Sequence, residues 1–111
     1  MTKPVLQEPS FLILTALAAG PQHGYGIMTD VAGISGDRIK LRAGTLYAAL
    51  DRLRSEGIID VDREEVVDGR LRRYYKLTQT GIAVLDEEVS RLNANVKVAA
   101  RRLRALAAGA S

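Results

Sequence analysis

The spacing of apolar residues changes several times along the chain, and each spacing predicts a different element. A dense apolar run predicts a first helix that is opened by Pro9, continues through Leu17 and is ended by Gly20-Pro21. This helix is apolar on nearly every side, so we expect a surplus face that a second copy of the chain covers. A second helix is predicted from about His23 to Val31, and the alternating segment 38–41 predicts one brief strand.

Leucines at positions 46, 50 and 53 follow the i, i+4, i+7 spacing of a buried helical stripe. They predict a third helix from about Ala43 to Glu56, with Gly57 as its stop. At about 100° per residue the opposite side of this helix carries Thr45, Ala48 and Arg52, with Tyr47 on the flank.

Two alternating segments, 58–65 and 70–78, predict a β-hairpin. A two-residue turn at Asp68-Gly69 would place apolar residues opposite charged ones on each face. We therefore predict a three-residue loop, 67–69, with Gly69 in the left-handed region. The resulting cross-strand pairs are Ile59 with Leu77, Asp60 with Lys76, Val61 with Tyr75, Asp62 with Tyr74, and Glu64 with Arg72.

Residues after Thr78, which can cap a helix, predict one long helix that ends near Ala107. Its apolar positions keep a 3,4 spacing that marks a seam against other helices. A helix of ~30 residues is ~45 Å long, more than this domain can cover, so we predict a homodimer. The expected dimerisation residues are Phe11, Leu14, Ile82, Leu85, Val89, Leu92, Val96, Leu103 and Leu106. Parallel and antiparallel packing of the two helices both stay open.

The composition fits one small domain with a docking appendage: 111 residues, a net charge of +3 and no cysteine. The basic residues concentrate on the third helix and the hairpin. The apolar run at 11–19 superficially matches a signal peptide, but only Lys3 precedes it and Glu8 offsets that charge. The run is also too short to span a bilayer, so we expect a cytoplasmic protein with no membrane segment.

Three short helices, a basic hairpin and a long terminal helix predict a mainly α (α+β) winged helix-turn-helix. We expect residues 1–78 to form the DNA-binding domain, with the two-stranded hairpin as its wing, and residues 79–111 to form the dimerisation helix.

Three segments carry a resemblance to a known family: "ILTALAAGPQHGYGI" from Ile13, "GTLYAALDRLRSEGII" from Gly44 and "GRLRRYYKLTQTG" from Gly69. In this order they resemble the PadR family of bacterial transcriptional regulators, specifically its compact branch with one helix after the wing. The resemblance implies a homodimeric repressor, often released by a small molecule. The chain departs from the family where Ala48 replaces a usual proline and Leu71 a frequent basic residue. It also lacks the tail tryptophan with which compact members sandwich flat drugs.

The predicted DNA-binding residues fall into two groups. Recognition helices read bases with exposed side chains near their N-terminal ends, a role that suits Thr45, Ala48 and Arg52. The phosphate-contacting group takes in the hairpin and the flank of the helix: Lys40, Arg42, Tyr47, Arg70, Arg72, Arg73 and Tyr74. The competing interpretation is a solvated helix face and arginines paired with Glu64 and Glu65 across the hairpin.

No residue set in the sequence predicts an enzyme, a metal site or a cofactor. The single histidine, His23, is expected to hold the start of the second helix, and Gly24 to permit a close helix crossing. The expected partners are double-stranded DNA with a palindromic operator, a second copy of the chain, and an unknown small-molecule effector. Two alternatives stay open: a small-molecule sensor with secondary DNA binding, and a winged helix that docks a protein.

Overall fold

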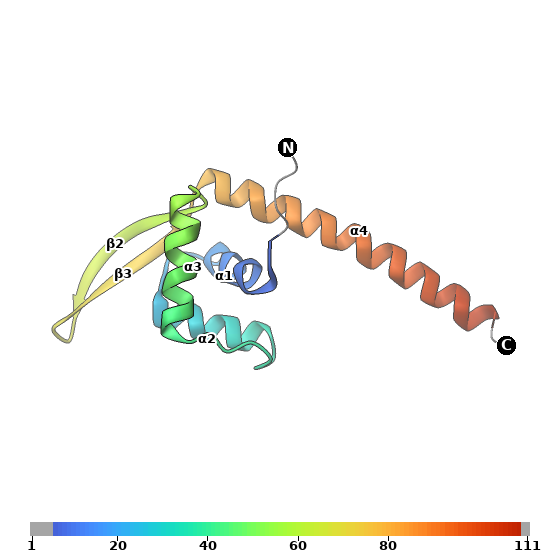
Figure 1. The fold of residues 1–111 in the computed structure, drawn as a ribbon, viewed down its shortest axis with the longest axis horizontal. Coiled ribbons are helices and arrows are strands. Elements are labelled where there is room, and N and C mark those ends of the chain that lie inside the picture. The colour runs from blue at the N-terminus through green and yellow to red at the C-terminus, as the bar shows by residue number, and fades with distance from the viewer. Residues whose placement is uncertain (1–5, 110–111) are drawn as a thin grey trace.

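The computed structural model describes residues 6–109 as a helical body from which two extensions project (Figure 1). The wing extends to one side and the last helix to the other, over 65 Å along the longest axis. The elements are α1 (Glu8–Ala18), β1 (Gln22–His23), α2 (Gly24–Ile34), α3 (Ala43–Ser55), β2 (Ile59–Val67), β3 (Arg70–Leu77) and α4 (Gln79–Gly109). The predicted positions of the four helices are confirmed.

Helix α1 lies at the centre of the body and packs against α2, α4 and β3. Leu12, Ile13 and Leu17 are therefore buried within the chain itself. The surplus face predicted for this helix is wrong, because these three elements cover it. Leu14, expected at a dimer interface, is fully buried in the same core and has no surface to offer a second copy. Phe11, the other residue of α1 expected at that interface, is partly buried against the same core.

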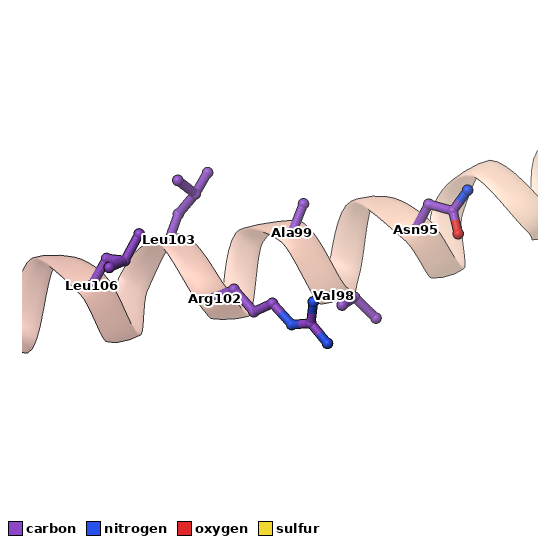
Figure 2. A pocket seen from close by; sticks show the side chains of 6 residues that line it. All are labelled: Asn95, Val98, Ala99, Arg102, Leu103 and Leu106. Atoms are coloured by element: carbon purple, nitrogen blue, oxygen red, sulfur yellow. The ribbon is translucent and has the colours of Figure 1, made fainter.

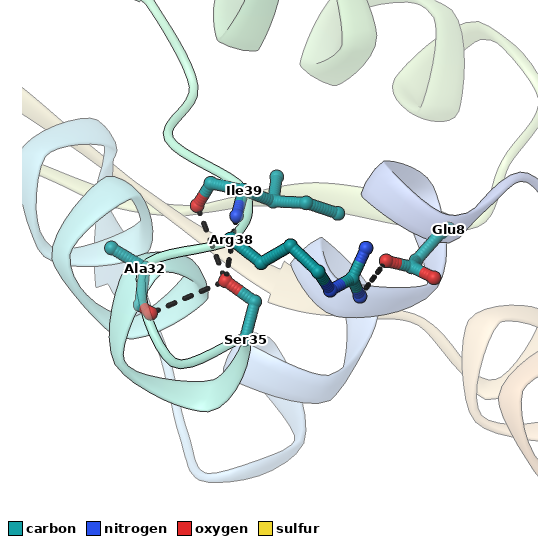
Figure 3. Close-up of polar contacts among 5 residues, drawn as sticks. All are labelled: Glu8, Ala32, Ser35, Arg38 and Ile39. Carbon is teal, nitrogen blue, oxygen red and sulfur yellow. Dashed lines mark hydrogen bonds and ion pairs between the residues drawn. The ribbon is translucent and has the colours of Figure 1, made fainter.

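The sheet has three strands in the order β1-β3-β2, with β1 contributed by Gln22 and His23. The brief strand predicted at 38–41 is wrong. Ser35 fixes that segment instead: its Oγ accepts from the Ile39 N–H at 3.0 Å and lies within 3.3 Å of the Ile39 carbonyl oxygen (Figure 3). The same figure shows Arg38 paired with Glu8 at the start of α1, which ties the segment before α3 to the body.

The base of the hairpin has the predicted register, with Ile59 opposite Leu77 and Val61 opposite Tyr75. The turn is the two-residue Asp68-Gly69, both with positive φ, so the predicted three-residue loop is wrong. The apolar-charged mismatch is removed by a β-bulge between Val61 and Arg63, partway along β2. Beyond the bulge Arg63 faces Tyr74, Glu64 faces Arg73 and Glu65 faces Arg72, which replaces the predicted Asp62–Tyr74 and Glu64–Arg72 pairs.

The first half of α4 belongs to the body. The Thr78 Oγ1 accepts from the Gly81 N–H at 3.0 Å, which confirms the predicted cap. Gly81 is buried so closely that a Cβ there would lie 2.0 Å from the Ile58 carbonyl oxygen. Farther along the helix the buried Glu88 accepts from the Leu6 N–H at 2.9 Å and also pairs with Arg91. The Arg91 hydrogen bond, with the one from Leu6, lowers the pKa of Glu88 below its ordinary value.

The second half of α4 extends beyond the body with nearly all of its side chains exposed. Figure 2 shows Ala99, Leu103 and Leu106 along this stretch, and the two leucines are 65% and 70% exposed. With Val96 they continue the predicted seam. Within the described residues, no helix combines the length and the apolar character needed to cross a membrane.

Candidate nucleic-acid interface

The N-terminal half of α3 presents an exposed surface that consists mostly of small and polar residues. Arg42 is the N-cap residue, and the side chains of Thr45 and Ala48 are exposed. Leu46, Leu50 and Leu53 are fully or almost fully buried on the other side, as predicted. The buried stripe therefore fixes which face of the helix is presented outward. The small side chains on that face allow the helix backbone to approach a flat surface closely.

Tyr47 sits at the edge of this surface and packs on the start of α2. A Cβ added to Gly24 would lie 2.5 Å from the Tyr47 hydroxyl oxygen, so glycine permits this crossing, as predicted. The tyrosine stays 46% exposed. The hydroxyl end of Tyr47 thus lies against α2, while about half of the residue reaches solvent at the edge of the α3 surface.

Arg52 lies farther along α3 and is engaged within the chain. Its Nη2 donates to the Ser10 Oγ at 2.6 Å, and its Nε lies 3.8 Å from the Glu56 carboxylate. The guanidinium is therefore directed towards the first turn of α1 and away from Thr45 and Ala48. In this conformation Arg52 positions α3 against the body.

The wing separates its three arginines into two kinds. Arg73 pairs across the strands with Glu64 at 3.3 Å, which is the competing interpretation realised for this residue. Arg70 and Arg72 are exposed, and neither forms a salt bridge with any residue between 6 and 109. Strand alternation puts both on the face that carries Tyr74, as predicted. Arg72 nevertheless lies opposite Glu65, and its charge contributes to the lowered pKa of that carboxyl.

The bulge places Arg63 over Tyr74, a contact that the predicted register did not contain. The guanidinium carbon lies 3.9 Å from the ring centroid, and His23 meets the ring edge-on at 5.3 Å. Tyr74 is therefore held between one side chain of the body and one of the wing. Arg63 also binds Glu65 at 2.7 Å and Asp62 at 3.0 Å, and its hydrogen bond lowers the pKa of the Glu65 carboxyl.

His23 has the expected structural role at the start of α2. As N-cap residue it accepts from the Gly26 N–H through Nδ1 at 3.2 Å. Lys40 is exposed on the segment before α3. Tyr25, on the first turn of α2, is 71% exposed, and the sequence did not predict this exposure. The exposure depends on how α2 packs, which the apolar character of the residue alone does not reveal. Among residues 6–109 no group of three or more metal-ligating side chains gathers.

A buried helical core, an exposed third helix and a basic two-stranded hairpin beside it define a winged helix protein. Residues 13–87 match the Transcriptional regulator PadR-like family, and the chain belongs to that family. Its members are transcriptional regulators and not enzymes.

Relatives and solved structures agree with this assignment. The chain is 45% identical over 76 residues to the transcriptional regulator Rv3488 of Mycobacterium tuberculosis, covering 68% of this chain and 67% of that protein. A PadR family regulator from Clostridium difficile has a similar structure, with a TM-score of 0.73, 26% identity, and 87% and 99% of the two chains covered. Bacillus subtilis PadR, solved in complex with operator DNA, shares the fold at 24% identity and a TM-score of 0.67, with 75% and 47% covered.

Proposed function

We propose that the chain is a homodimeric, sequence-specific DNA-binding repressor that recognises a palindromic operator. The observation that carries this proposal has two parts. The start of α3 is exposed and carries small side chains, and two arginines of the wing form no salt bridge with any residue between 6 and 109. A helix of this kind enters the major groove, and cations beside it neutralise phosphates. The operator complex of the Bacillus subtilis protein makes duplex DNA the first ligand to test.

The DNA contacts divide between the two elements. Thr45 and Ala48 read base edges, since a hydroxyl can donate or accept and a methyl can touch thymine. Three further residues, Lys40, Arg42 and Tyr47, bind phosphates beside α3. The wing binds phosphates through Arg70 and Arg72, with Arg73 joining them if its pair with Glu64 opens. Arg52 and Tyr74 support these contacts from within the chain, through Ser10 and His23.

The homodimer forms through α4, whose exposed apolar residues continue past the body. The interface consists of Ile82, Val89, Leu92, Val96, Leu103 and Leu106, together with Phe11 and the half-buried Leu85. Residues 6–78 then act as the DNA-binding domain and α4 as the dimerisation helix. Two-fold symmetry places the half-site centres about 34–36 Å apart, one turn of duplex.

Selection from random duplexes tests the proposal, with enrichment of a palindrome as the expected result. Arg72→Ala should lower the slope of log K against log salt by about 0.9 for each phosphate that the side chain neutralises, without changing the enriched sequence. Arg101→Ala is the matched control: it removes an exposed arginine that lies on α4, away from the wing, and it should leave the slope unchanged. An Arg72→Ala dimer with the full slope contradicts a wing contact. Absence of any enriched palindrome favours a winged helix that docks a protein.

A second candidate function is release by a small molecule. A cleft of about 280 Å³ lies where α1, α2 and α4 meet, with Phe11, Ile34 and Leu92 among its lining residues. Arg38 at its edge pairs with Glu8 and belongs to the segment that leads into α3. A ligand there would contact both the dimerisation helix and the approach to the recognition helix. In a thermal-shift screen such a ligand should raise the melting temperature of the protein, because a ligand that binds only the folded state stabilises that state.

A further inference from the structure

Glu65 on the wing is a carboxylate with two arginines beside it. It lies directly opposite Arg72 across the hairpin, in the position where opposite charges ordinarily pair. Arg63 lies two residues away along the same strand, so strand alternation places it on the same face as Glu65. The two guanidinium groups therefore compete for one carboxylate. The outcome of this competition determines which arginine remains available for an anion.

The carboxylate is paired with Arg63. The Arg63 Nε lies 2.7 Å from Oε1 of Glu65, and its Nη1 lies 3.0 Å from Oδ2 of Asp62. Arg72 forms no salt bridge with any residue between 6 and 109. The hydrogen bond from Arg63 is the main cause of the lowered pKa of Glu65, and the charge of Arg72 contributes less. The guanidinium of Arg72 is thus attracted by the carboxylate without being bound to it.

Tyr74 holds the Arg63 side chain in this arrangement. The guanidinium carbon lies 3.9 Å from the centroid of the Tyr74 ring. His23 meets the same ring edge-on, and its own ring is oriented by the hydrogen bond that it accepts from the Gly26 N–H. One row of side chains therefore crosses all three strands, from His23 through Tyr74 to Arg63. Because this row already orders Arg63, its pair with Glu65 requires less loss of side-chain freedom than a pair with Arg72 would.

We propose that Arg63 is a positioning residue that holds Glu65 away from Arg72 and so keeps Arg72 available for a phosphate of the operator. The inference rests on the DNA binding proposed above and adds the residue that prepares the wing for it. Without Arg63, the carboxylate would pair with the arginine opposite it. That pair would have to open before Arg72 could bind a phosphate, so binding would be weaker.

The first test compares the affinities of four variants for the selected operator. Arg63→Ala should bind about fivefold more weakly, the effect of one exposed ion pair that opposes binding. Arg63→Ala/Glu65→Gln should bind within about twofold of the unchanged protein, because no carboxylate then captures Arg72. Arg63→Ala/Asp62→Asn is the matched control: it has the same net charge but should stay weak, since Asp62 lies at the bulge and does not face Arg72. Adding Arg72→Ala to the Glu65→Gln double variant should abolish the restoration.

A second measurement needs no DNA. Titration of the Glu65 carboxyl, followed by nuclear magnetic resonance, reports which arginine lies beside it. In the unchanged protein, Arg72→Ala should raise the pKa of Glu65 slightly. In the Arg63→Ala protein, the same substitution should raise that pKa more, because Arg72 has then become the partner of the carboxylate. An equal rise in the two proteins contradicts the exchange of partners.

The outcomes separate this inference from the proposed function. Full affinity of Arg63→Ala refutes the positioning role, and equal restoration by Glu65→Gln and Asp62→Asn refutes it by showing that only net charge matters. A restoration that persists without Arg72 also refutes it, since Glu65 then acts on the DNA directly. If the unchanged protein binds no duplex, the repressor proposal fails, and the titration still decides whether Arg63 withholds Glu65 from Arg72. Thermal melting of each variant checks that it remains folded.

Discussion

The two halves of α4 form one continuous helix but have opposite relations to the rest of the chain. The first half is fixed to the body by Gly81 against Ile58 and by Glu88 on the Leu6 N–H. The second half projects from the body and exposes Leu103 and Leu106. Backbone fit and hydrogen bonds determine the first half, whereas an apolar stripe in water dominates the second. The comparison shows that the helix is anchored at one end so that its other end is presented at a defined angle.

Gly81→Ala should disrupt the packing of the anchored half of α4 on the body and have the largest effect on stability. The new Cβ would meet a backbone carbonyl oxygen at 2.0 Å, so the helix and the segment at Ile58 must move apart. We expect a decrease of about 3 kcal/mol in the free energy of unfolding, roughly 15 °C in melting temperature. Gly33→Ala is the matched control, since no atom lies within 4 Å of its added Cβ. That variant should gain up to about 1 kcal/mol from a better helix former. Equal melting temperatures for the two variants would contradict the close approach.

The double variant Leu103→Glu/Leu106→Glu should prevent self-association through the exposed half of α4. Charges in the seam oppose its burial against a second copy, so we expect sedimentation to show a monomer that keeps its helical circular dichroism. The melting temperature should fall less than in Gly81→Ala and should no longer depend on protein concentration. Ala94→Glu adds a charge outside the seam of the same helix and should leave the proposed dimer intact. If the double variant stays dimeric, the interface lies elsewhere.

Glu88→Gln tests the anchored half of α4 and should have the smallest effect on melting temperature of these variants. The pKa of Glu88 is lowered in the folded chain by Arg91 and the Leu6 N–H. Its contribution to stability is therefore present above the ordinary carboxyl pKa and is lost as pH falls through the lower, folded-state value. The melting temperature of the unchanged protein should fall over that acidic range, and that of Glu88→Gln should fall less. The two curves should lie farthest apart near neutral pH. Parallel curves would show that the carboxylate is not coupled to folding.

The sequence predicted what side-chain spacing determines and missed what depends on packing. The stripe of Leu46, Leu50 and Leu53 set the orientation of α3, and Thr78 marked the start of α4. Strand β1 was missed because two residues carry no periodicity. The bulge at Asp62 was misplaced into the turn because either position restores the alternation of side chains, and only the backbone chooses between them.

The candidate interface follows the same division. Exposure of Thr45 and Ala48 followed from the stripe, and the faces of Arg70 and Arg72 from alternation. The bond from Arg52 to Ser10 depends on how α1 and α3 meet, 42 residues apart in the chain, which spacing within one helix does not contain. Leu14 was assigned to a partner because the sequence does not show how many elements surround α1.

The close contact of Gly81 with Ile58 sets the tilt of the long helix α4. Helix α4 has 31 residues, so a tilt of about 5° at its anchored end would displace the far end by about 4 Å. In the proposed dimer, substitutions around Ile58 would therefore change the distance between the two subunits, although Ile58 is distant from the helix tip. A change at this joint would then alter the operator spacing that the proposed dimer prefers.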